Sequence, residues 1–103
     1  MIATVAEHRA ELESLCRRYA VRRLEVFGSA AAGTHQSDRS DLDFLVEFEE
    51  SKKGGEYADN FFGMLEGLEL LFGGKIDMII GSAIRNPYFR QSVEQTKSLL
   101  YAA

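Results

Sequence analysis

Several features that would assign a protein to a particular class are missing from this sequence of 103 residues. Cysteine occurs once, at Cys16, so no disulfide can form within the chain. No run approaches the roughly 20 apolar residues that a membrane-spanning helix needs. Residues 1–8 also lack the basic region and the apolar run of a secretory signal. We therefore expect a cytoplasmic protein without a membrane segment.

An excess of positive charge is missing as well, because 12 Lys and Arg residues stand against 16 Asp and Glu residues. Proteins that bind nucleic acid broadly hold its phosphates with clustered Lys and Arg. We therefore expect no direct nucleic-acid binding, and any nucleotide must be held at a local site. The hydrophobic content of 46% is typical of a folded protein. A chain of this length encloses one core, so we expect a single domain over residues 1–103.

The spacing of apolar residues predicts a mixture of helices and strands. Cys16 falls on the apolar side of the first helix, so its thiol should be buried. The order of elements predicts an α/β (α+β) fold, in which helices pack on a small mixed β-sheet. Helices are expected at 5–19, 57–72 and 87–101, a short helical turn at 29–32, and strands at 21–28, 41–48 and 75–80.

Local signals mark the ends of several of these elements. Thr4 and Glu7 have the spacing of a capping box at the start of the first helix. Gly73 is typical of a residue that ends a helix. Asn86 before Pro87 combines a side-chain cap with a residue whose missing N–H costs nothing at the first helical position.

Three aspartates lie within the predicted strands. Asp41 and Asp43 are two residues apart, so both side chains point to one face, and Asp77 lies within the third strand. Aspartate is depleted in strands and is costly on a covered face unless a cation compensates its charge. Carboxylate oxygens suit Mg²⁺ or Mn²⁺, which also bind waters and substrate phosphates. The three residues therefore indicate a metal site, although an aspartate at the end of a strand could also merely cap or solvate that end.

The dipeptide Gly28-Ser29 follows the first predicted strand. A strand that turns at glycine into a helix presents unpaired N–H groups and the positive end of the helix dipole to an anion. The serine hydroxyl adds one more donor. An ordinary tight turn with a helix cap would show the same two residues. Only their combination with the strand aspartates favours a phosphate site.

Taken together, these residues resemble the signature of the nucleotidyltransferase superfamily typified by DNA polymerase beta, and in particular the minimal nucleotidyltransferases. In that family a Gly-Ser turn is followed by Asp-x-Asp on the next strand, which matches Asp41-Leu42-Asp43, and by a third aspartate, which matches Asp77. The tail at 84–90 is also similar to the C-terminal segment of these small proteins. The spacer at 30–40 is one residue longer than the commonest family spacing, and Ala32 stands where many members carry arginine. We expect these departures to affect efficiency more than fold.

The resemblance implies a nucleotidyltransferase fold and a role for each matched residue. Gly28 and Ser29 would hold the triphosphate of ATP or another nucleoside triphosphate. Asp41 and Asp43 would ligate two Mg²⁺ ions, for which Mn²⁺ could substitute, while Asp77 would complete one metal site and could take a proton. The three carboxylates should then converge on one concave face beside the N–H groups of Ser29 and the next residue. The implied reaction is transfer of a nucleoside monophosphate, AMP from ATP, to a hydroxyl acceptor.

The resemblance also implies a partner, because small family members are commonly paired with a HEPN-domain protein in toxin–antitoxin modules. The chain would then be an antitoxin that adenylylates a tyrosine of its toxin. The alternative is a non-catalytic antitoxin that neutralises the HEPN partner by complex formation. We expect no further domain that would bind an acceptor, so a partner should bring it. The sequence leaves the acceptor, the preferred base and the oligomeric state open.

Overall fold

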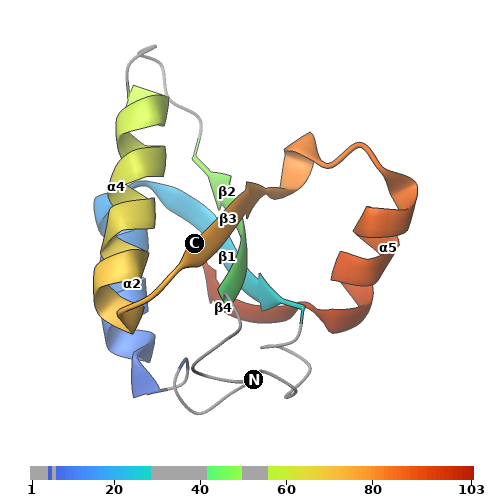
Figure 1. The fold of residues 1–103 in the computed structure, drawn as a ribbon. Coiled ribbons are helices and arrows are strands. Elements are labelled where there is room, and N and C mark those ends of the chain that lie inside the picture. Colours follow the sequence, from blue (N-terminus) through green and yellow to red (C-terminus); the bar gives the residue numbers. More distant parts are fainter. Residues whose placement is uncertain (1–4, 6, 29–41, 50–55) are drawn as a thin grey trace.

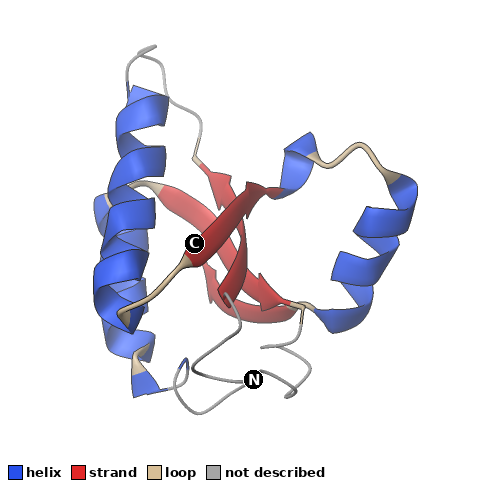
Figure 2. Cartoon of the chain, viewed as in Figure 1, coloured by secondary structure: helices blue, strands red, loops and turns tan. Residues whose placement is uncertain are grey.

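A four-stranded mixed sheet forms the centre of the computed structural model, which describes residues 5, 7–28, 42–49 and 56–103. The strand order is β3-β2-β1-β4. α2 (Arg9–Arg18) and α4 (Glu56–Phe72) cover one face of the sheet, and α5 (Pro87–Thr96) lies on the other face (Figures 1 and 2). The elements are α2 (Arg9–Arg18), β1 (Val21–Phe27), β2 (Leu42–Phe48), α4 (Glu56–Phe72), β3 (Ile76–Ile80), the 3-10 helix η1 (Gly81–Ala83), α5 (Pro87–Thr96) and β4 (Ser98–Ala102).

The register of the strands determines which side chains share a face. β1 lies in the middle and pairs antiparallel with both β2 and β4. β2 and β3 run parallel, as expected for strands that are joined through a helix. The predicted small mixed sheet with packed helices is therefore confirmed, and it has one strand more than predicted, β4.

Alternation along the strands divides the apolar residues between two cores. Phe44 and Val46 are fully buried in the larger core, together with Met64 of α4. Leu45 points to the other face and packs in a smaller core with Phe27 of β1 and Val93 of α5. The same alternation was predicted for the strand at 41–48, and it means that the face toward α5 receives the odd-numbered side chains of β2.

The predicted first helix is interrupted near its start. Val5 and Glu7 are helical, but a turn at His8 separates them from α2. His8 makes no side-chain cap bond to the backbone. Its ring bonds the Glu11 carboxylate at 2.6 Å and packs edge-on against Phe72 of α4. His8 thus contacts α4 at the interruption. The predicted cap at Thr4 lies outside the described residues.

The prediction of one helix from 87 to 101 is wrong in its second half. The start is confirmed, since Asn86 Oδ1 accepts hydrogen bonds from the N–H groups of Tyr88 and Phe89. The helix ends at Thr96, however, and the chain continues as β4 along the free edge of β1. An apolar run of a few residues suits a helix or a strand. The N–H and C=O groups on the edge of β1 need hydrogen-bond partners, and this favours a strand over a helix. As a strand, the segment buries Leu100 in the larger core, where it is 3% exposed.

None of the helices in the described ranges is long and apolar enough to cross a membrane.

Candidate functional site

Asp43 and Asp77 lie next to each other on neighbouring strands. They are Cα partners in the parallel pairing of β2 with β3, so their side chains share one face of the sheet, across a strand spacing of about 5 Å. The next residues along these strands, Phe44 and Met78, pack in the larger core. Both aspartates therefore point to the opposite face, toward the side of α5. Asp43 is half-buried and Asp77 is exposed, so a ligand on this face can reach both carboxylates.

The turn after β1 brings Gly28 against the Asp43 carboxylate. Phe27, the last residue of β1, is the Cα partner of Asp43. Gly28 has a φ of +76°, a conformation that glycine adopts without strain. A Cβ atom at this position would lie 2.7 Å from Asp43 Oδ2. Glycine is therefore needed here both for its conformation and for the close approach of the backbone to the carboxylate.

The N–H of Gly28 is already engaged within the protein. It donates a hydrogen bond of 3.0 Å to Thr96 Oγ1, at the end of α5. A phosphate at this turn would thus need the donors that follow Gly28 in the chain, beginning with Ser29. This contact between residues 68 positions apart was not anticipated, because the sequence does not reveal where α5 ends.

Two of the predicted site residues, Ser29 and Asp41, lie outside the described residues, as do Ala32 and the spacer that departs from the family pattern. Within the described part of the chain, no group of three or more His, Cys, Asp and Glu side chains could hold a metal ion. Asp43 and Asp77 nevertheless suit Mg²⁺, which binds through one or two carboxylates and completes its shell with waters and substrate phosphate oxygens. The donors present therefore fit a hard divalent cation held together with a nucleotide.

Glu47 is a third carboxylate on this face, and it has a structural partner. It lies four residues after Asp43, about 13 Å along β2. The backbone N–H and the hydroxyl of Ser82 both donate to it, the hydroxyl at 3.2 Å. A Cβ atom at Gly81 would lie 2.7 Å from its Oε1 atom. Glu47 therefore holds η1 against the sheet and lies away from the aspartate pair.

A shallow groove occurs elsewhere, between α2 and α4, with Leu15, Tyr19 and Leu71 among its lining residues. These helices cover the sheet face opposite Asp43 and Asp77. The groove is therefore separate from the carboxylates.

Comparison with known proteins agrees with this geometry. The family model for the nucleotidyltransferase domain matches residues 9–100. A relative from Methanocaldococcus jannaschii, named for protein adenylyltransferase activity, is 40% identical over 79% of this chain and 78% of its own length. A solved structure named for a minimal nucleotidyltransferase is 32% identical and has a TM-score of 0.74, over 92% of this chain and 91% of that chain.

A more distant structure, 13% identical, is a complex of a tri-AMPylated HEPN toxin of Shewanella oneidensis with an MNT antitoxin. It matches with a TM-score of 0.63 over 96% of this chain and 73% of that chain. At this identity the likeness shows the fold alone.

Proposed function

The chain belongs to the nucleotidyltransferase domain family, and from that premise we propose that it is an Mg²⁺-dependent protein adenylyltransferase. In this proposal it transfers AMP from ATP to a hydroxyl group of a HEPN partner and thereby acts as an antitoxin. The observation that carries the proposal is the in-register pair of Asp43 and Asp77 on an accessible face, next to the glycine turn at the end of β1.

Each site residue has a proposed part in the reaction. Asp41, Asp43 and Asp77 would hold the metal, and Asp77, which is exposed, would accept the proton of the acceptor hydroxyl. Ser29 supplies donors to the triphosphate, whereas Gly28 contributes by letting the backbone approach Asp43. When bound, Mg²⁺ supplies charge neutralisation at the phosphoryl group and at the departing pyrophosphate. Attack by the hydroxyl oxygen forms the new P–O bond as the bond to pyrophosphate breaks.

The AMP donor and the HEPN acceptor are supported by the relatives. The Methanocaldococcus jannaschii relative carries the name of a protein adenylyltransferase. The HEPN toxin in the structurally similar complex is AMPylated. The net charge of -4 is consistent with an acceptor that is a protein and not a nucleic acid.

The direct test is transfer of label from α-labelled ATP, with Mg²⁺, to the protein encoded by the neighbouring gene. We expect label on that protein, and loss of labelling when a chelator removes the metal. Asp43→Asn should lower the rate by at least about 100-fold, because a metal-holding charge is worth several kcal/mol in the transition state. Asp59→Asn is the matched control, since Asp59 is exposed on α4.

Two results would reject the proposal. One is a purified complex with the partner that shows no transfer under any divalent metal. The other is equal labelling by wild type and Asp43→Asn. Melting temperatures provide a second readout, because Mg²⁺ with ATP should stabilise wild type and Asp59→Asn but not Asp43→Asn.

A further inference from the structure

We propose that Thr96 is a positioning residue of the nucleotide site, whose hydroxyl holds the Gly28 turn against the Asp43 carboxylate. Its meaning for catalysis rests on the proposed function. Thr96 lies at the last position of α5, and its sequence neighbours give no sign of a role beyond that helix. In the structure it provides the hydrogen bond from α5 to Gly28.

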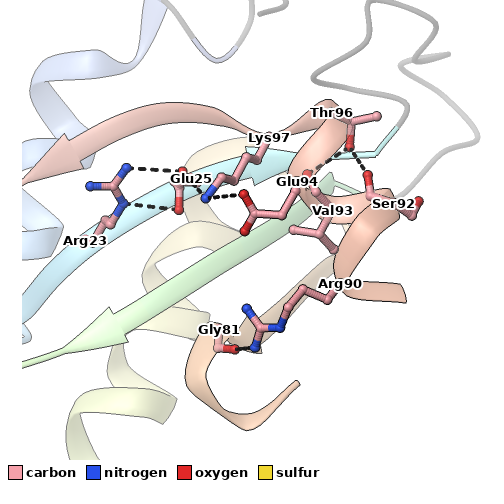
Figure 3. A network of polar contacts seen from close by, with 9 residues as sticks. All are labelled: Arg23, Glu25, Gly81, Arg90, Ser92, Val93, Glu94, Thr96 and Lys97. Carbon is pink, nitrogen blue, oxygen red and sulfur yellow. Dashed lines mark hydrogen bonds and ion pairs between the residues drawn. The ribbon is translucent and has the colours of Figure 1, made fainter. Parts of the chain in front are cut away.

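The direction of this hydrogen bond is determined by the helix. Thr96 Oγ1 lies 3.1 Å from the carbonyl oxygen of Ser92 and 3.5 Å from that of Val93, in addition to 3.0 Å from the N atom of Gly28. A hydroxyl has a single proton, and carbonyl oxygens can only accept. The hydroxyl therefore donates to its own helix (Figure 3), and it accepts from the N–H of Gly28.

The contact between Thr96 and Gly28 replaces a backbone hydrogen bond that would otherwise join β1 and β4 at this position. β1 and β4 are paired antiparallel at Val26 and Ser98. Gly28 lies two residues after Val26, and Thr96 lies two residues before Ser98. At Thr96 the chain is still helical, so its backbone cannot continue the ladder. The side-chain oxygen supplies the acceptor that a strand carbonyl would otherwise provide, which satisfies the N–H of Gly28.

Neighbouring ion pairs hold Thr96 in place relative to β1. Lys97 Nζ lies 3.6 Å from Glu25 Oε2 and 3.0 Å from Glu94 Oε2. Glu25 is only 5% exposed, and Arg23 Nε lies 3.2 Å from its other oxygen. Figure 3 shows this chain of contacts leading from β1 to the end of α5. The ion pairs therefore fix the position of the Thr96 hydroxyl relative to β1 and Gly28.

Loss of this acceptor should release the peptide group between residues 27 and 28. Rotation of that peptide changes the direction in which the chain leaves β1 and the distance between the Gly28 backbone and Asp43. Thr96 itself need not touch the nucleotide. Its contribution is to keep the turn and the metal-binding strand in one relative position.

The test compares variants that differ in the hydroxyl. Thr96→Val removes the acceptor and keeps the size and branching of the side chain, whereas Thr96→Ser keeps the acceptor. Ser92→Ala is the matched control, because it removes a hydroxyl from the same helix and leaves the Ser92 carbonyl in place. The first readout is hydrogen exchange of the Gly28 amide by NMR, which needs no nucleotide. We expect exchange about tenfold faster in Thr96→Val, and unchanged exchange in Thr96→Ser and Ser92→Ala.

The second readout is steady-state transfer with the partner protein, with KM for ATP and kcat measured separately. Thr96→Val should lower kcat/KM by about 10- to 100-fold, the effect of a small misplacement of a binding element. Thr96→Ser should restore most of it. Thr96→Ala gives a second hydroxyl-free variant, should the valine variant fail to fold.

The proposal is overturned if Gly28 exchange is the same in wild type and in the hydroxyl-free variants. Equal loss of kcat/KM in Thr96→Ser and Thr96→Val would also overturn it, since packing of the methyl group would then be responsible. A wild-type protein that transfers no AMP would reject the proposed function instead. In that case Gly28 exchange still decides whether the hydroxyl holds the turn.

Discussion

Gly28 and Gly81 show that the same local arrangement serves two purposes in this protein. Each glycine lies where a Cβ atom would approach a carboxylate oxygen of β2 to 2.7 Å, Asp43 in the first case and Glu47 in the second. Glu47 is bonded to Ser82 and supports the fold. Asp43 instead faces Asp77 across the parallel strand pair. A glycine beside a carboxylate is therefore not by itself a sign of a site, and the second aspartate is what distinguishes the two positions.

Cys16 provides a prediction about stability at alkaline pH. The thiol is fully buried, as expected from its place on the helix. Burial raises the pKa of Cys16 from 9.0 to about 12, and the Glu13 carboxylate adds to the effect. The thiol therefore stays protonated in the folded protein at a pH where the unfolded chain ionises. Its contribution to stability is complete below pH 9.0 and is lost as the pH rises toward about 12.

The expected size of this effect follows from the pKa difference. Between about pH 8 and about pH 10.5, the free energy of unfolding of wild type should fall by about 2 kcal/mol more than that of Cys16→Ala, since each pKa unit corresponds to about 1.4 kcal/mol. Urea denaturation of both proteins at the two pH values measures the difference. The alanine variant removes the contribution of Tyr and Lys titration from the comparison. Parallel losses in the two proteins would contradict a buried, neutral thiol.

Among the elements, α5 and β4 connect the candidate site to the core. α5 packs Val93 against Phe27 and Leu45, and Phe89 lies edge-on to Phe27 at 6.0 Å between ring centroids. Arg90 donates to the carbonyl oxygens of Gly81 and Ile84. The helix is thus held at its beginning by the η1 segment and at its end by β1.

β4 yields a prediction that distinguishes a strand from the helix expected over the same residues. Leu100 is 3% exposed and Leu99 is 44% exposed. Leu100→Ala should cost about 2–5 kcal/mol of unfolding free energy, the range for truncation of a buried leucine. Leu99→Ala has the same change in side chain and should cost less than about 1 kcal/mol. Denaturant titration of both variants is the measurement, and equal losses would contradict the alternating burial of β4.

On the scale of the whole molecule, one face of the sheet forms the larger core and the other face carries the candidate site. The face under α2 and α4 buries the larger core, including Phe44, Leu12 and Leu68. The face toward α5 has the smaller core and carries Asp43 and Asp77. Substitution of these aspartates should therefore leave the larger core and the helices above it intact, which makes it possible to separate catalysis from binding.

Rescue of cells that express the proposed HEPN toxin partner uses this separation. We expect wild type to rescue growth and the Asp41→Asn, Asp43→Asn double variant to fail, because under the proposed function these two residues hold the metal that transfer requires. The variant should still bind the toxin in a pull-down assay. Rescue equal to wild type would show that occupation of the partner's surface is enough, which is the non-catalytic alternative. The Asp59→Asn variant serves as a control and should rescue fully.

Much of this protein could be predicted from local patterns in the sequence. The apolar spacing predicted β1, β2, α4 and β3 to within a residue or two, because each of these elements has a strong period of its own. The alternation along β2 also predicted that Asp43 points to the face opposite Phe44. The start of α5 at Asn86 was predicted because its cap involves only neighbouring residues.

Only the tertiary structure decided the features that depend on pairing between distant segments. The residues of β4 suit a helix or a strand, and the open edge of β1 selected the strand. The alternation within each strand does not show that Asp77 lies beside Asp43, because that depends on the parallel register of β2 with β3. The contact of Thr96 with Gly28 joins residues 68 positions apart. Such contacts depend on how far each element extends and which edge it meets, and the energies that settle both are those of strand pairing and burial.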